Sequence, residues 1–227
     1  MNKAESWLEK ALNYRFQNAE LFQQALSHRS ATRRNNERLE FLGDAVLDFV
    51  VSGAVYQACP GAAEGDLSKL RALLVRDTSL AELANEIGLG EHLILGSGEQ
   101  KTGGHRRESI LADALEAIFG AIFLDSGYDA AKKVIDRLYG QRYSNLPDIT
   151  ELRDPKTRLQ EWLQGRKMEL PGYELVEVSG EDHKQRFAVT CTVAEISAIT
   201  SGESTTRRKA EQKAARKMLE ILAEKGR

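Results

Sequence analysis

Cysteine is scarce in this chain of 227 residues, which contains two, Cys59 and Cys191. They stand far apart in the sequence, and neither belongs to a Cys-x-x-Cys pair or has histidines at zinc-ligand spacing. The sequence therefore argues against a disulfide framework and against a structural zinc site. A reducing compartment, the cytoplasm, is the expected location.

Long apolar runs are also missing. No stretch reaches the roughly 18 consecutive apolar residues that a membrane-spanning helix needs. The first six residues, MNKAES, lack the basic-then-apolar profile of a secretion signal. We therefore expect a cytoplasmic protein that has no contact with a membrane.

The net charge is small, −2, and by itself indicates no class of partner. Its distribution along the chain is more informative. Residues 152–227 contain 15 Lys and Arg against 12 Asp and Glu, whereas residues 1–151 contain 17 against 22. An acidic first part and a mildly basic second part predict two domains with different tasks.

The spacing of apolar residues predicts only helices in the first 143 residues. These helices cover residues 4–14, 19–27, 37–57 (after an Asn35-Asn36 cap), 67–87, 108–124 and 129–143. Residues 96–107, with three basic residues and a histidine, are predicted to form a flexible loop. Its composition fits a phosphate-contacting loop and a plain surface connection equally well.

The periodicity changes after residue 154. Pro155 suits the first turn of a helix, and residues 173–179, 185–193 and 195–201 read as strands before a last helix over 206–224. We therefore predict a multidomain chain. An all-α domain (residues 1–147) and a linker (148–154) precede a small α+β domain of order α-β-β-β-α (155–227).

Residues 36–47 (NERLEFLGDAVL) contain three acids on one side of a predicted helix. Glu37, Glu40 and Asp44 fall within an arc of about 60°. Stacked like charges destabilise a lone helix, so we expect a positive partner, with a divalent cation as the leading candidate. A solvated acidic face is the alternative.

A second acidic pair, Asp113 and Glu116, lies one turn apart in an otherwise apolar helix. Buried, unpaired carboxylates carry a large desolvation cost. Oxygen ligands without histidine or cysteine favour Mg²⁺ or Mn²⁺, and carboxylates on two facing helices that share such ions can hydrolyse a phosphodiester. Glu64, expected to be isolated in a loop, is a further candidate, although a surface role fits its spacing equally well.

The second part of the chain offers three separated polar sites. Residues 207–209 (RRK) begin the last helix, where free N–H groups also attract anions, and His183 lies in a predicted turn. The polar face of the helix after Pro155 is the third site. Such spacing suits a nucleic-acid duplex, and double-stranded RNA is read by shape over roughly 16 bp.

These motifs resemble those of the ribonuclease III family. The stretch 36–47 looks like its signature, and residues 25–30 (ALSHRS), 64–68 (EGDLS) and 109–117 (SILADALEA) resemble its other blocks in family order. Residues 154–223 are similar to the double-stranded RNA-binding domain that follows in bacterial members, through DPKT at 154–157 and RRKAEQKAA at 207–215.

The resemblance implies a homodimeric endonuclease that uses Mg²⁺, or Mn²⁺ in its place, and no small-molecule cofactor. It implies cleavage of both RNA strands, leaving 5′-phosphates and short 3′ overhangs, in the processing of structured precursors such as ribosomal and messenger RNA. By position, the metal ligands would be Glu40, Asp44, Asp113 and Glu116, with Asp44 and Glu116 catalytic and with Glu37 and Glu64 as accessory acids. The RNA contacts would be Thr157, Gln160, Glu161, Gln164, His183, Arg207 and Arg208.

Phe41 matches the family's interface aromatic, which inserts into a pocket of the partner subunit, although a plain core role is the alternative for this residue. A catalytically silent RNA-binding regulator is the main alternative for the whole chain. Such a relative should have lost at least one acid, whereas all six positions here are acidic. A nuclease for DNA or single strands would also fit the acids, but the second domain argues for an A-form duplex.

Overall fold

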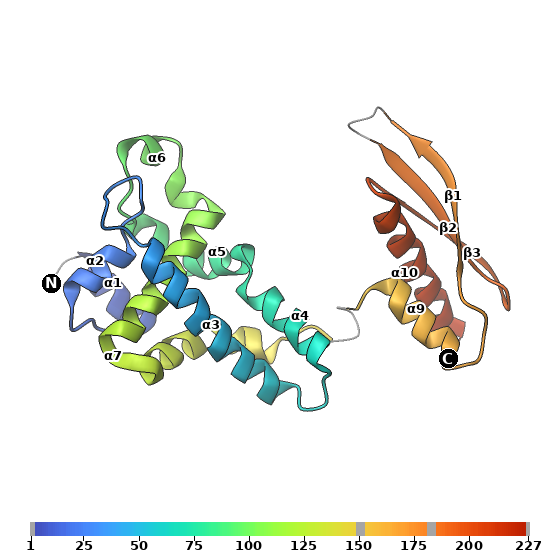
Figure 1. Cartoon of the computed structure of the whole chain (residues 1–227), viewed down its shortest axis with the longest axis horizontal. Coiled ribbons are helices and arrows are strands. Elements are labelled where there is room, and N and C mark those ends of the chain that lie inside the picture. Colours follow the sequence, from blue (N-terminus) through green and yellow to red (C-terminus); the bar gives the residue numbers. More distant parts are fainter. Residues whose placement is uncertain (1–2, 149–152, 181–184, 226–227) are drawn as a thin grey trace. The chain divides into compact units, whose positions relative to one another are not determined.

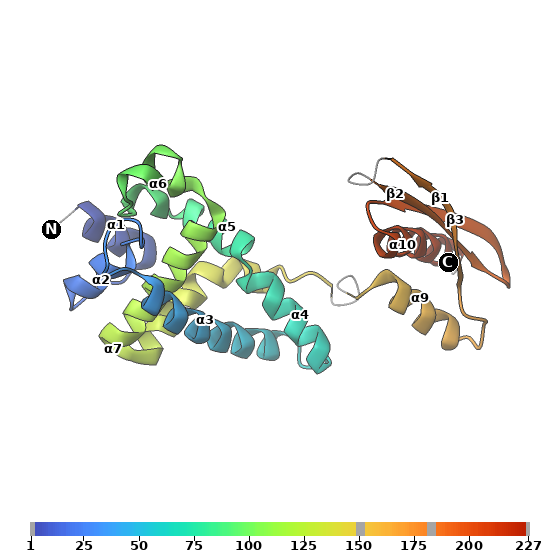
Figure 2. The same cartoon turned by 45° about the horizontal axis from the view of Figure 1, so that its top comes forward.

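The computed structural model describes residues 3–148, 153–180 and 185–225. The chain divides into two compact units, residues 1–146 and 147–227. The first unit is built from helices, and the second packs helices against a three-stranded sheet (Figures 1 and 2). The predicted fold class, an all-α unit followed by α-β-β-β-α, is confirmed. Of the expected linker, residues 149–152 lie outside the described residues.

The first unit is organised around two long helices, α3 and α7. Its elements are α1 (Lys3–Leu12), α2 (Ala19–Ala25), α3 (Glu37–Ala58), α4 (Glu64–Val75), α5 (Asp77–Glu86), η1 (Leu89–His92), α6 (Ser97–Lys101), η2 (Gly104–Arg106) and α7 (Glu108–Ser144). Helix α7 is interrupted at Gly127, whose φ of 78° is a positive value that glycine adopts without steric cost. This break separates the two helices predicted over 108–124 and 129–143.

Two glycines let α3 and α7 touch backbone to backbone. A Cβ atom added to Gly43 would lie 1.8 Å from the carbonyl oxygen of Glu116, and one added to Gly120 would lie 2.2 Å from that of Leu39. No side chain fits at either position. The close approach brings the acids of α3 and those of α7 to one crossing.

The single helix predicted over residues 67–87 is wrong. The chain forms α4 and α5, separated at Arg76, whose backbone is extended (φ −65°, ψ 152°). The hydroxyl of Ser79 donates to the Leu73 carbonyl oxygen at 2.8 Å and accepts from Arg76 Nε at 3.3 Å. A side chain thus satisfies a carbonyl near the end of α4, and a new helix begins at Asp77.

Two further local predictions are corrected. Glu64 does not lie in a loop but is the first residue of α4. The segment 96–107 is not an open loop, because it contains the short helices α6 and η2. An ion pair of 2.7 Å joins Arg107 to Glu99, and Gly96 N donates to Ser30 Oγ at 2.9 Å, so the segment is folded against the chain before α3.

The second unit is an antiparallel sheet with two helices. It contains α9 (Pro155–Gln164), β1 (Gly172–Ser179), β2 (Arg186–Val193), β3 (Ile196–Ser204) and α10 (Arg207–Lys225), with strand order β1-β2-β3. Alternate residues of β2, including Val189, Cys191 and Val193, are buried, as the period-two pattern predicted. Cys191 and Val193 form one core with Leu159, Leu163, Ala214, Ala215, Met218 and Leu222 of the two helices.

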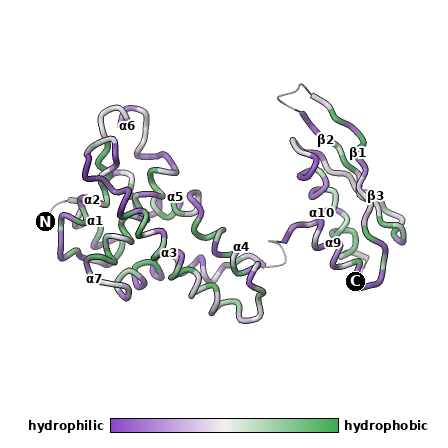
Figure 3. The backbone as a smooth tube through the Cα atoms, in the orientation of Figure 1, coloured by the Kyte–Doolittle hydropathy of each residue, from purple (hydrophilic) through white to green (hydrophobic). Residues whose placement is uncertain are grey.

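Hydrophilic and hydrophobic residues mix along most helices of both units (Figure 3), whereas residues 117–122 of α7 are buried on every side. In residues 3–148, 153–180 and 185–225, no helix has the length and apolar character needed to cross a membrane.

Candidate active site

Four carboxylates of α3 and α7 share one site at the crossing of these helices. Glu40 and Asp44 lie one turn apart on α3, and Asp113 and Glu116 lie one turn apart on α7. Gly43 lies against the backbone of Glu116, so Asp44, the next residue of α3, lies beside the acids of α7. Burial, then the charges of Asp44, Asp113 and Glu40, raise the pKa of Glu116 to about 8.

The other three acids feel the same environment. Burial, followed by the charge of Asp113, raises the pKa of Glu40. Burial is also the first cause that raises the pKa of Asp44 and of Asp113. The first unit therefore concentrates negative charge that its own residues compensate only in part, an arrangement typical of a functional site.

The donor set fits a divalent cation. All four candidate ligands are carboxylates, the hard oxygen donors that Mg²⁺ and Mn²⁺ prefer, and their mutual repulsion is what a bound cation would relieve. Within the described residues, no three His, Cys, Asp or Glu side chains converge closely enough to ligate one ion as they stand. The fit therefore lies in the chemistry of the donors and in the effect that their charges have on one another's pKa values.

Asp77 is an acid of this site that the sequence reasoning missed. It is the first residue of α5, and its charge raises the pKa of both Asp113 and Glu116. The signal was present as Asp77-Thr78-Ser79, residue types that favour a helix start. It was overlooked because the apolar period continues through the break between α4 and α5.

The two accessory acids have different surroundings. Glu37 accepts hydrogen bonds from Asn35 Nδ2 at 2.9 Å and from Arg29 Nη1 at 3.4 Å, and its charge contributes to the raised pKa of Glu40. It therefore borders the four central acids. Glu64 accepts from Ser68 Oγ at 2.9 Å, and no described contact brings it to the four central acids.

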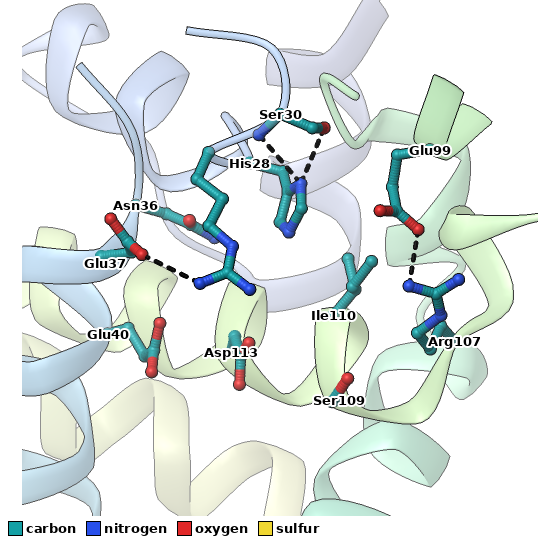
Figure 4. Close-up of a pocket in the computed structure, with 11 residues that line it drawn as sticks. His28, Ser30, Asn36, Glu37, Glu40, Glu99, Arg107, Ser109, Ile110 and Asp113 are labelled. Carbon is teal, nitrogen blue, oxygen red and sulfur yellow. Dashed lines mark hydrogen bonds and ion pairs between the residues drawn. The ribbon is translucent and has the colours of Figure 1, made fainter. Parts of the chain in front are cut away.

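A cavity of about 490 Å³ opens beside Glu40 and Asp113. It is lined by His28, Arg29, Ser30, Asn36, Glu37, Glu40, Glu99, Arg107, Ser109, Ile110 and Asp113 (Figure 4). His28 Nδ1 lies 2.8 Å from Ser30 Oγ, and the charges of His28 and Arg29 oppose the rise in the pKa of Asp113.

The cavity is therefore lined by arginines as well as by acids. Glu99 and Arg107 face Glu37, Glu40 and Asp113 across it (Figure 4). An anionic substrate that approached these carboxylates would meet Arg29 and Arg107 at the same cavity. Arg107 is one of the three basic residues of segment 96–107, for which the sequence left a phosphate-contacting role open, and Arg29 lies within the motif 25–30.

Phe41 lies on the surface of α3 and is 80% exposed, which excludes the alternative of a core residue. Phe49 and Tyr56 on the same helix are also exposed. Spacings of eight and seven residues bring the three rings to one side of α3. The first unit therefore has a row of exposed aromatic side chains.

The candidate RNA contacts of the second unit are solvent-facing where the structure describes them. Thr157, Gln160, Glu161 and Gln164 are exposed on α9, and Arg207 and Arg208 are exposed at the start of α10. Asp154, which precedes α9, accepts from Gln212 Nε2 at 2.7 Å and thereby joins the beginnings of the two helices. His183 lies outside the described residues.

Comparison with protein-family models gives two matches. Residues 18–142 match the model described as ribonuclease-III-like, and residues 155–222 match the double-stranded RNA binding motif. The first match contains the six acids predicted from the sequence and also Asp77, and the second contains both arginines at the start of α10.

Similar proteins agree with both matches. "Ribonuclease 3" of Alkalilimnicola ehrlichii is 52% identical over 218 residues, 96% of each chain, and that of Glaesserella parasuis is 49% identical over 215 residues. The crystal structure of the ribonuclease III nuclease domain from Campylobacter jejuni covers 64% of this chain and all of that one, with 45% identity and a TM-score of 0.61. A second structure of that domain, with a TM-score of 0.59 and 47% identity, is described as showing flexibility in a region involved in dimer formation.

Proposed function

Because this chain belongs to the ribonuclease III family, we propose that it is an endoribonuclease that cleaves double-stranded RNA. The observation that carries the proposal is the meeting of Glu40, Asp44, Asp113 and Glu116 at the crossing of α3 and α7. The retention of all six acids argues against the alternative, a catalytically silent RNA-binding regulator.

The residues at the crossing would divide the chemistry of phosphodiester hydrolysis. Glu40, Asp44, Asp113 and Glu116 would hold Mg²⁺, or Mn²⁺ in its place, which when bound activates water and stabilises the leaving oxygen. Asp44 and Glu116 are the acids to which we assign the catalytic role. The burial of Glu116 lowers the local dielectric, so its charge acts strongly on groups beside it.

The cations of the cavity would guide the RNA backbone toward the acids. Arg29 donates a hydrogen bond to Glu37, and Arg107 is paired with Glu99. Both arginines offset the negative potential that a phosphate would otherwise meet. As an accessory acid, Glu37 would hold the side chain of Arg29 in place. Glu64 is also proposed as an accessory acid, on the family resemblance alone.

The second unit would hold the duplex. Thr157, Gln160, Glu161 and Gln164 on α9, with Arg207 and Arg208 on α10, are the proposed contacts with an A-form groove and its phosphates, and His183 is a further proposed contact. We expect the products to have 5′-phosphates and short 3′ overhangs and the substrates to be structured ribosomal and messenger RNA precursors. Free cysteines at positions 59 and 191 are compatible with the cytoplasm.

Incubation with a long RNA duplex tests the proposed activity. We expect cleavage of both strands with Mg²⁺ and none with EDTA, because the hydrolysis depends on a cation held by the four carboxylates. The ends are mapped on each strand, and 5′-phosphates are detected with a phosphate-dependent exonuclease. A DNA duplex of the same sequence and a single-stranded RNA serve as controls. Binding of duplex RNA without cleavage in Mg²⁺ or Mn²⁺ would favour the silent regulator.

We further propose that the chain forms a homodimer through the aromatic row of α3, with one active centre in each protomer. The exposure of Phe41 supports this assignment, since a large aromatic ring of this kind is typical of an interface anchor.

The replacement Phe41→Ala tests the dimer. We expect the dimer dissociation constant, measured by analytical ultracentrifugation, to rise by at least about 30-fold, because loss of an interface anchor costs about 2 kcal/mol or more. Leu170→Ala removes another exposed apolar side chain, 56% exposed, from the second unit and should leave the dimer unchanged. Equal dissociation constants for the Phe41 variant and the parent would contradict the assigned interface.

A further inference from the structure

A partly buried carboxylate lies beneath the basic start of α10. The side chain of Glu211 is 12% exposed. Its Oε2 accepts a hydrogen bond from Lys156 Nζ at 2.6 Å, and its Oε1 accepts one from Arg207 Nε at 3.0 Å. The two cations come from different helices, α9 and α10, so Glu211 ties the beginnings of these helices together.

Lys156 is held inward by this arrangement. Besides the bond to Glu211, its ammonium group lies 4.4 Å from the centre of the Tyr173 ring, a cation–π contact with β1. Burial opposes ionisation of Glu211, but the hydrogen bonds from Lys156 and Arg207 hold the pKa of this carboxyl below its usual range. Glu211 is therefore charged near neutral pH and has two cationic partners.

Arg207 points outward from the same carboxylate. Its side chain is 58% exposed, and it reaches Glu211 through Nε. Its two terminal amino groups donate no hydrogen bond to any residue that the structure describes. A guanidinium held at Nε still directs three of its four terminal N–H bonds away from the anchor, and these bonds form a fork that matches the oxygens of a phosphate.

The neighbouring arginine lacks such an anchor. Arg208 is 82% exposed, and its Nη2 lies 3.9 Å from Asp154 Oδ2. Asp154 already accepts hydrogen bonds from Gln212 Nε2 and from the Lys156 backbone N–H. The structure thus distinguishes one arginine that is held in a defined orientation from one that is loosely paired.

We propose that Glu211 is a positioning residue that presents the Arg207 guanidinium to a phosphate of the RNA duplex. The proposal rests on the proposed RNA contact of Arg207. Its mechanism is preorganisation, because an arginine already held in its binding orientation loses less side-chain entropy when the phosphate arrives. The opposite role, competition with phosphate for Arg207, would require the carboxylate to occupy the terminal amino groups, and it binds Nε instead.

A double-mutant cycle on the full chain tests this role. Affinity for an RNA duplex longer than about 16 bp is measured in EDTA, where we expect no cleavage, over a series of salt concentrations. We expect Arg207→Gln to weaken binding roughly tenfold and to reduce the salt slope by about 1, as for loss of one phosphate contact. Glu211→Gln should weaken binding by about 3-fold or more, and adding Arg207→Gln to it should cost less than about 3-fold.

Two further variants complete the experiment. Glu220→Gln, at an exposed position of α10, is the matched control and should bind like the parent. Arg207→Lys leaves the carboxylate in place and does not depend on how well the Glu211 variant folds. Lysine keeps the charge but lacks the planar fork that can hold Glu211 through Nε and a phosphate through its terminal nitrogens. We therefore expect Arg207→Lys to keep the salt slope of the parent and to bind the duplex about 3-fold more weakly.

The outcomes separate this proposal from the proposed function. Failure of the parent to bind duplex RNA would sink the proposed function itself. If Arg207→Gln weakens binding but Glu211→Gln binds as well as the parent or more tightly, or if the two effects add fully, the positioning role is overturned. Parent-like binding by Arg207→Lys would overturn it as well, and thermal unfolding monitored by circular dichroism verifies that each variant is folded.

Discussion

The replacement Glu116→Gln is expected to abolish cleavage of duplex RNA while duplex binding stays intact. Glu116 is the candidate ligand whose pKa burial and neighbouring acids raise furthest, and glutamine removes its charge while keeping its shape. Because metal-ion catalysis supplies several kcal/mol of transition-state stabilisation, we expect the cleavage rate with Mg²⁺ to fall by roughly 1,000-fold or more. Binding is expected to persist because Glu116 is not among the proposed RNA contacts, most of which lie in the second unit.

The control for this variant is Glu108→Gln, which removes an exposed carboxylate from the same helix and should cleave at the parent rate. Thermal unfolding without metal gives a second readout. Burial and repulsion from Asp44, Asp113 and Glu40 disfavour a charged Glu116. Glu116→Gln removes both costs, so the variant should unfold at the parent temperature or above it. Parent-like cleavage by Glu116→Gln would contradict the assignment of Glu116 as a metal ligand.

The replacements Gly43→Ala and Gly120→Ala are expected to destabilise the first unit and to disable the site together. A Cβ at Gly43 would overlap the Glu116 carbonyl oxygen, and one at Gly120 would overlap that of Leu39. Because the obstacle is backbone and cannot rotate away, we expect the free energy of unfolding, measured by chemical denaturation, to fall by more than about 3 kcal/mol. An acid displaced by about 1 Å would also lower the cleavage rate of any folded fraction roughly 100-fold.

Each glycine has a matched control on its own helix. Gly53 on α3 and Gly140 on α7 have nothing within 4 Å of an added Cβ. Replacing either with alanine should leave stability unchanged or raise it by about 0.5–1 kcal/mol, because alanine is the better helix former. If Gly43→Ala proved as stable and active as Gly53→Ala, the close crossing of α3 and α7 could not be what positions the acids.

The positions of most helices and strands could be predicted from local pattern. The spacing of apolar residues placed α3, the two halves of α7 and the strands β1 and β2 within a few residues of their observed bounds. Apolar period did not reveal the break at Arg76, because the buried residues of α4 and α5 continue the pattern on both sides. The break depends on hydrogen bonds of the Ser79 hydroxyl, which periodicity does not report.

The candidate site was also predicted only in part, because local pattern does not report contacts between distant segments. The acids of α3 and α7 stand out in the sequence because charges are unusual among apolar neighbours. Asp77 and Arg29 do not, since each lies in a segment where a charged residue is ordinary, and Arg107 was noted only as one of the three basic residues of segment 96–107. Only their contacts with the acids and with the cavity show their place.

Residue type and spacing by themselves determined that two pairs of acids lie on helical faces, that a basic α+β unit follows, and to which family the chain belongs. These properties are local, since they depend on residues within a few turns of each other. Tertiary structure alone decided that the two acidic pairs meet, because their proximity requires α3 and α7 to approach at Gly43 and Gly120. It also decided the exposure of Phe41 and the anchoring of Arg207 by Glu211, because both depend on which surfaces the packing of helices leaves free.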